Sequence, residues 1–358
     1  MQELLSQAGK LYTLLKIDEV SNLGAARIRV RSLIAAMKMR KRGAEELSPL
    51  RDYKRVVYTE DMQAAGYTIL TTEMSRIHFT FLEPAFRSAG YNLVFMDNEG
   101  RSVVDAGLKY VNNDACYPAL ITTGQIVDAV LSGQYDTDHL AVMMIQAGGG
   151  CRASNYIGMI RKALQNAGYG HIPVISANLV GMESNPGFTI TPKMLLKAIQ
   201  GAIYGDVFMR LVLHVRAHES NPGNADRLFQ KWEGILRSQL AEPELHMERF
   251  LRNCEQIIRE YDAIPQDEAR DKPKVGIVGE MLVKYMPLSN NHLIDMLEAE
   301  GAEAVMPDLV LYMEYVFGND PYKAEVLGMS KKAAVLSKVA ISFLETIRGR
   351  IHKALDMR

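Results

Sequence analysis

The chain has 358 residues, of which 48% are apolar and 23% charged, with 41 basic against 42 acidic side chains. At roughly 150 residues per domain this length predicts about two domains, and the balanced charge argues against a nucleic-acid-binding protein. The N-terminus lacks the features of a secretory signal, and no apolar run reaches the roughly 20 residues that a bilayer crossing requires. We therefore expect a cytoplasmic protein that binds no membrane.

Residues 1–54 are expected to form a helical arm. Apolar residues recur at helical spacing in 4–17 and again in 26–39, with a break near 21–25. Two helices are therefore predicted here.

Residues 55–185 are expected to form a first α/β domain. Short β-type runs at 67–72, 91–97, 139–146 and 172–178 alternate with amphipathic stretches at 79–90, after Cys116 and from Ser154. Strict alternation of strand and helix predicts a doubly wound parallel sheet of the flavodoxin or Rossmann kind, covered on both faces.

Residues 186–271 are expected to form a helical layer and a charged, proline-bounded linker, and residues 272–358 a second α/β domain. The second domain shows strand patterns only at 274–279 and 302–308. Since most sheets have four to six strands, we expect this second doubly wound sheet to be truncated. The helix predicted over 330–355 would then lead into a missing portion.

The chain has three cysteines, and two of them occupy similar surroundings. Cys151 follows three glycines after an apolar run and precedes Arg152 and a helix, for which Ser154 is a plausible N-cap. The positive end of that helix would stabilise a thiolate. The residues leave open a metal ligand, a nucleophile, a phosphate-binding loop, or a tight turn with an incidental cysteine.

Cys116 repeats the order of apolar approach, polar turn, cysteine and helix, with Pro118 in the first turn. Two thiols from strand-to-helix turns at one edge of one sheet suit an iron–sulfur cluster better than a lone nucleophile, for which neither His139 nor His171 supplies a recognisable base. Cys254 lies inside a continuous amphipathic helix and is expected to be a packing residue.

The run Gly148 to Tyr156 resembles a Gly-Gly-X-Cys-Arg-X-Ser-Asn-Tyr motif of the 2-hydroxyacyl-CoA dehydratase family, in the branch of large activase-related and double-cubane cluster proteins. Segments 110–136 and 272–303 and the Tyr-Gly-Asp at 204–206 are similar to that family as well. The resemblance implies metal ligands at Cys116 and Cys151, and cofactor contacts from Gly148, Gly149, Gly150, Arg152, Ser154 and Asn155.

The resemblance further implies a 4Fe-4S cluster or a double cubane, reduced by an ATP-dependent iron–sulfur activator protein. Reduction of a 2-hydroxyacyl-CoA thioester to a ketyl radical would permit loss of water, which makes the chain a lyase subunit in a homo- or heterodimer of an anaerobic enzyme. The alternatives are an ATP-driven low-potential reductase component and a non-catalytic electron-transfer or scaffold module. No catalytic acid or base is assigned, and the third cysteine ligand of the family has no counterpart in this chain.

Overall fold

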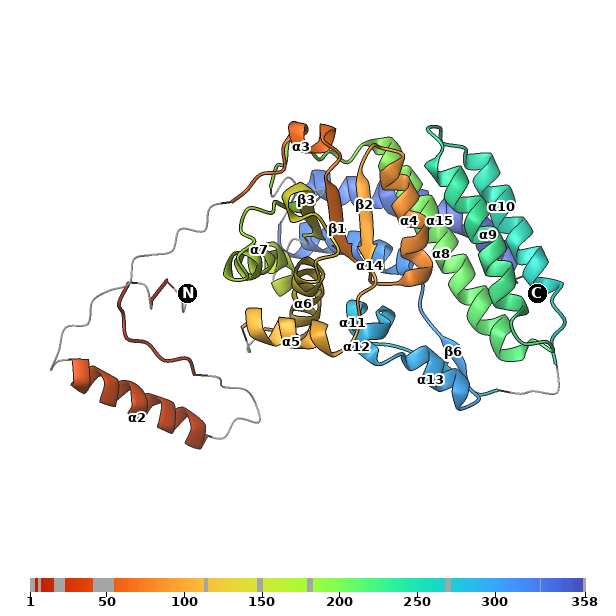
Figure 1. Cartoon of the computed structure of the whole chain (residues 1–358). Helices are drawn as coiled ribbons and strands as arrows, with labels where there is room; N and C mark the ends of the chain where they lie inside the picture. The colour runs from red at the N-terminus through yellow and green to blue at the C-terminus, as the bar shows by residue number, and fades with distance from the viewer. Residues whose placement is uncertain are drawn as a thin grey trace. The chain divides into compact units, whose positions relative to one another are not determined.

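The fold is described from a computed structural model of the whole chain (Figure 1). The structure describes residues 4–5, 8–15, 23–40, 55–112, 115–146, 151–178, 183–267, 272–328 and 330–356. The chain divides into two units, Met1–Arg55 and Val56–Arg358. The finer boundaries predicted within the second unit stay predictions.

The first unit contains one of its two predicted helices, α2 (Leu23–Arg40). Residues 8–15, within the other predicted helix, are not helical, so that prediction is wrong for them. Gly9 has a positive φ of 59°, and the apolar side chains of Leu11, Leu14 and Leu15 are exposed. Short helices are only marginally stable unless an apolar face packs against other residues. The leucines of this segment are exposed, so it has no packed apolar face.

The second unit contains a parallel four-strand sheet in the order β2-β1-β3-β4. This confirms the prediction of an α/β protein with a parallel sheet. Side chains alternate between the two faces, since Ile69 packs in one core cluster and the adjacent Leu70 in another. The strands are β1 (Thr68–Thr72), β2 (Asn92–Met96), β3 (Leu140–Ile145) and β4 (Val174–Ala177).

Helices cover both faces of this sheet, with α6 and α7 on one side and α4 and the start of α8 on the other (Figure 1). One helix of this layer, α5, was not predicted; it lies between β2 and α6 and packs against α6. The elements are α3 (Glu60–Ala64), α4 (Arg76–Arg87), α5 (Arg101–Tyr110), α6 (Tyr117–Leu131), η1 (Thr137–His139), η2 (Arg152–Asn155), α7 (Tyr156–Asn166) and α8 (Pro192–His218).

The predicted helical layer consists of α8 together with α9 (Asn224–Ala241) and α10 (Met247–Asp262). Its core contains Phe208, Trp232 and Tyr261. Leu344 and Ile347 of the last helix pack into the same core. That helix therefore folds back onto the layer, and the expectation that it leads into a missing portion stays a prediction.

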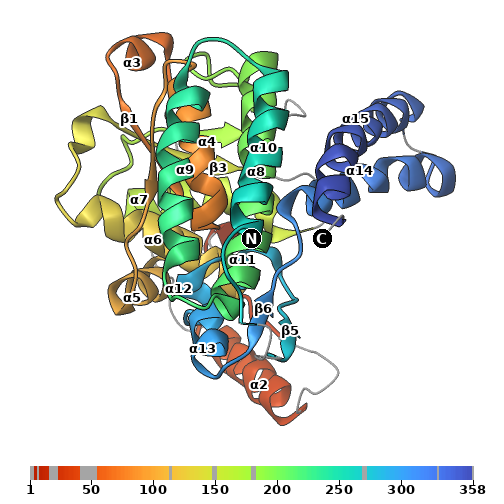
Figure 2. The same cartoon turned by 90° about the vertical axis from the view of Figure 1, so that its right-hand side faces the viewer.

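The second sheet has two parallel strands among the described residues, β5 (Lys274–Gly276) and β6 (Glu303–Val305). Figure 2 shows them beside the lower end of α8, and shows the last two helices as a hairpin at the side of the layer. The remaining helices are α11 (Met281–Tyr285), α12 (Pro287–Asn290), α13 (Leu293–Ala299), α14 (Leu309–Val326) and α15 (Lys331–Asp356). In the part of the chain that is described, no helix combines the length and apolar character needed to span a bilayer.

A buried polar network joins α4, α8 and α14. The Nε2 atom of His78 lies 2.9 Å from Oδ1 of Asp206, and Nδ1 lies 2.8 Å from Oγ of Ser75. Because a carboxylate only accepts, Nε2 carries a proton and donates it to Asp206. Asp206 also accepts from the amides of Leu309 and Val310 at the start of α14. The Asp of the Tyr-Gly-Asp segment therefore has a structural role.

Candidate functional site

Cys116 is the N-cap residue of α6, with φ −66° and ψ 155°. Pro118 lies in the first turn, where a missing amide proton costs nothing. The half-buried thiol lies 3.6 Å from the hydroxyl of Tyr156. Because Cys116 follows helix α5, the expectation of a strand-to-helix turn at this cysteine is wrong.

Cys151 is exposed and is the N-cap residue of the short helix η2, which follows β3. Its sulfur accepts from the amide of Ala153 at 3.5 Å, and the Ser154 hydroxyl donates to its carbonyl oxygen at 2.6 Å. The structure thus places both thiols at the beginnings of helices, as the sequence predicts. Orphan amides and the helix dipole favour negative charge at such positions.

A chain of side-chain hydrogen bonds anchors the segment that carries Cys151. The Gln146 amide donates to the carbonyl oxygen of Ser154 at 2.8 Å. The Ser176 hydroxyl donates to the Gln146 side-chain oxygen at 2.6 Å, and the Asn178 amide donates to the Ser176 hydroxyl at 2.7 Å. Since Gln146 and Ser176 come from the carboxyl ends of β3 and β4, the sheet itself holds the cysteine segment in position.

Tyr156 lies at the start of α7, is only 6% exposed, and has its hydroxyl 3.6 Å from the Cys116 sulfur. Burial raises the pKa of Tyr156 above its ordinary value, and the hydrogen bond with Cys116 and the charges of Glu280 and Cys151 add to the shift. Burial also raises the pKa of Tyr312, again assisted by Glu280 and Cys151. The two thiols, a carboxylate and two phenols therefore belong to one electrostatic neighbourhood.

This neighbourhood lies beyond the carboxyl ends of the strands. In the order β2-β1-β3-β4 the chain reverses its direction of winding between β1 and β3, the place where parallel sheets of this type bind ligands. Thiolate sulfurs are ligands for zinc, copper(I) and iron–sulfur clusters. Glu280 is the N-cap residue of α11 and accepts from the amide of Val283 at 2.9 Å. Glu280 was not among the predicted site residues.

The remaining predicted cofactor contacts have different outcomes. Residues Gly148, Gly149 and Gly150 and the side chain of Arg152 lie outside the described part of the structure. Ser154 lies within η2, so its prediction as an N-cap is wrong, because η2 begins earlier, at Arg152, with Cys151 as its N-cap. Asn155 is exposed, and a Cβ atom on Gly158 would lie 2.6 Å from its side-chain oxygen.

Cys254 lies away from this site, inside α10. It is completely buried in the core of the helical layer, together with Phe250 and Ile257. Burial raises the pKa of the Cys254 thiol far above its ordinary value. It is therefore a packing residue, as predicted, and a poor source of a thiolate.

The two histidines considered as bases for a nucleophilic cysteine lie at the opposite edge of the sheet. His139 immediately precedes β3 and pairs with Asp136 at 2.8 Å. His171 precedes β4, and its Nε2 lies 3.1 Å from the carbonyl oxygen of Thr137. Neither can deprotonate Cys151, which follows the carboxyl end of β3.

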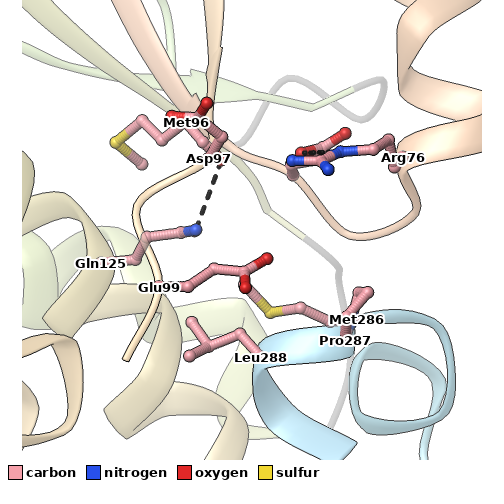
Figure 3. Close-up of a pocket in the computed structure, with 9 residues that line it drawn as sticks. Arg76, Met96, Asp97, Glu99, Gln125, Met286, Pro287 and Leu288 are labelled. Carbon is pink, nitrogen blue, oxygen red and sulfur yellow. Dashed lines mark hydrogen bonds and ion pairs between the residues drawn. The ribbon is translucent and has the colours of Figure 1, made fainter. Parts of the chain in front are cut away.

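A small acidic pocket at the carboxyl ends of β1 and β2 was not predicted. It is lined by Glu73, Arg76, Asp97, Glu99 and Gln125, and closed by Met286, Pro287 and Leu288 (Figure 3). Burial raises the pKa of Glu73; Arg76 opposes this shift, and Asp97 and Glu99 add to it. Perturbed carboxyl groups in clefts are candidates for proton transfer. The signal was present, because Glu73 directly follows one predicted strand and Asp97 is the last residue of another.

The chain matches no protein-family model, no curated protein and no solved structure.

Proposed function

We propose that the protein binds an iron–sulfur cluster at the carboxyl edge of the four-strand sheet, with Cys116 and Cys151 as two of the ligands. The observation that carries the proposal is that both cysteines are N-cap residues and that both contribute to the raised pKa of one buried phenol, Tyr156. Cysteine sulfurs are the usual protein ligands of iron–sulfur clusters.

A third protein ligand of the proposed cluster is needed besides Cys116 and Cys151. Cys254 does not fit, since it is buried in another core. Glu280 supplies a carboxylate close enough to Tyr156 and Tyr312 to shift the pKa of both. We propose that either this carboxylate or a thiolate from a second chain completes the set, as the dimer that the resemblance implies would allow.

We propose a dehydratase-type activity, the removal of water from a 2-hydroxyacyl-CoA thioester in a cytoplasmic enzyme. The cluster, charged by an ATP-dependent iron–sulfur activator, would supply the electron for this chemistry. The chain would contribute the Tyr156 hydroxyl as a hydrogen-bond donor to the Cys116 sulfur, which tunes a cluster's potential. Glu73, in the pocket at the same sheet edge, is the residue we propose for moving a proton. The finer fold proposal is that β5 and β6 begin a second doubly wound sheet.

The deciding experiment is anaerobic reconstitution of the full chain with iron and sulfide, followed by iron and sulfide analysis and visible absorbance. Cys116→Ser and Cys151→Ser should each abolish stable incorporation, whereas Cys254→Ser, the matched control, should leave it unchanged. Loss of incorporation in Glu280→Gln identifies the carboxylate as the third ligand. Retention in Glu280→Gln assigns that position to a second chain.

The iron count also separates the alternatives. Four irons per site favour the dehydratase, and eight per paired site favour the low-potential reductase with a double cubane. Absence of iron from the wild-type chain after reconstitution, or equal iron in all cysteine variants, would overturn the proposal and leave the non-catalytic module.

A further inference from the structure

We propose a second metal site, independent of the cysteines: a Zn²⁺ ion bound by His214, His218 and Glu303. The two histidines are one turn apart on α8, so they project from the same face of the helix. Glu303 reaches them from β6. Among the described residues, these are the three His, Cys, Asp or Glu side chains whose ligand atoms all lie within 4.8 Å of one another.

The geometry is close to that of a metal site. Nδ1 of His214 lies 3.0 Å from one oxygen of Glu303, and Nε2 of His218 lies 3.0 Å from the other. With Zn–N and Zn–O bonds of about 2.0–2.2 Å, tetrahedral ligand atoms are about 3.4 Å apart. On zinc binding, the two nitrogen–oxygen contacts with Glu303 would therefore lengthen by a few tenths of an ångström.

The protonation states also permit metal binding. The ring nitrogens that face Glu303 carry protons in this arrangement, because a carboxylate can only accept. In a neutral imidazole the proton can move to the other ring nitrogen, which frees the facing lone pair for the metal. Binding then requires a change of tautomer, and no other residue has to take up a proton.

The charges around His214, His218 and Glu303 permit a cation to bind between them. Glu303 is 6% exposed and brings a negative charge into the site. Lys274 lies 3.9 Å from it, but its side chain is 66% exposed and can turn into solvent. Arg216, on the turn between the histidines, is paired with Glu298 and Asp226 and points at those carboxylates.

Two histidines and a glutamate leave the fourth tetrahedral position to water, and His214 is 38% exposed, so solvent can reach it. The two histidines have the spacing of the His-Glu-X-X-His motif of zinc hydrolases, but the buried Val215 occupies the position of the catalytic glutamate. We infer that the ion fastens β6 of the second sheet to α8 and has no hydrolytic role.

The test is titration of the chelator-treated, full-length chain with Zn²⁺ in competition with a chromophoric chelator. Zinc also binds thiolates, so the reference protein is the Cys116→Ser/Cys151→Ser double variant, which should still bind one equivalent. In that background His214→Ala and Glu303→Gln should weaken binding at least about 100-fold, since even outer residues of zinc sites cost 10- to 100-fold. His246→Ala, a surface histidine at the start of α10, is the matched control and should bind like the reference.

Thermal unfolding gives a second readout that needs no competing chelator, because an ion that binds only the folded chain raises its Tm. Zinc should raise the Tm of the reference and of His246→Ala, and should leave the Tm of His214→Ala and Glu303→Gln unchanged. The proposal is wrong if the reference binds no zinc, or if the ligand variants bind it as tightly as His246→Ala. Because the reference lacks both Cys116 and Cys151 and zinc is the probe, neither result depends on the iron–sulfur proposal.

Discussion

Replacement of Asp206 by alanine should destabilise the protein by about 2–4 kcal/mol. The carboxylate accepts from His78 and from the amides of Leu309 and Val310, at 2.9, 2.6 and 3.1 Å. Loss of a helix cap costs about 1 kcal/mol. The His78 ring is 0% exposed, so leaving its N–H without an acceptor adds a further ~1–3 kcal/mol to the loss of stability.

Urea unfolding followed by circular dichroism measures this loss as a shift of the midpoint at constant slope. Asp206→Asn keeps the volume and one acceptor, so it should lose less stability than Asp206→Ala. Asp105→Ala removes an exposed partner of Arg101 and should cost under about 1 kcal/mol. If Asp206→Ala costs no more than Asp105→Ala, the network does not stabilise the fold and the reasoning fails.

Three further predictions concern the cores. Cys254→Ala should cost on the order of 1 kcal/mol in urea unfolding, and a loss of bound iron from this variant would contradict its assignment as packing. Gly124→Ala should cost about 1–3 kcal/mol, because its Cβ would lie 2.3 Å from the backbone oxygen of Val103; a thermal midpoint equal to wild type would argue against this close approach. Burial lowers the pKa of Lys197 in the folded protein below its ordinary value of 10.5. At pH values between these two pKa values the unfolded chain binds more protons than the folded one, so the free energy of unfolding rises with pH in that window. Lys197→Met should remove that rise in unfolding midpoints measured across alkaline pH, and a rise that persists would assign it to another group.

The sequence predicted the strands of the main sheet because each is a short apolar run bounded by turn residues. The order of the strands in the sheet could not be read from the sequence. The position of β2 outside β1, and not between β1 and β3, depends on the path of the crossover connections. Helix α5 was missed because Gly107 takes the place of a core side chain in its pattern. A Cβ there would lie 2.5 Å from the backbone oxygen of Leu120, so the glycine permits the close contact with α6.

The candidate site was predictable where its residues share a local pattern. Cys116 and Cys151 each precede a helix, and that arrangement is visible in the sequence. Glu280 and Tyr312 join them only because α11 and α14 fold back to the same edge. Likewise, His214 and His218 show helical spacing, but their partner Glu303 comes from a strand 85 residues after His218. Long-range pairings of this kind leave no local trace.

Helix α8 packs against the main sheet, the helical layer and the second sheet. Its first turns pack on the main sheet through Met194, its middle carries Asp206, and its last turn faces β6 through His218. Glycines usually loosen a helix, but Gly201 and Gly205 lie against α4, where a Cβ would meet Phe81 and His78 at 2.8 and 2.3 Å. A hinge between the two sheets therefore cannot lie at Gly201 or Gly205 without breaking the contact between α8 and α4.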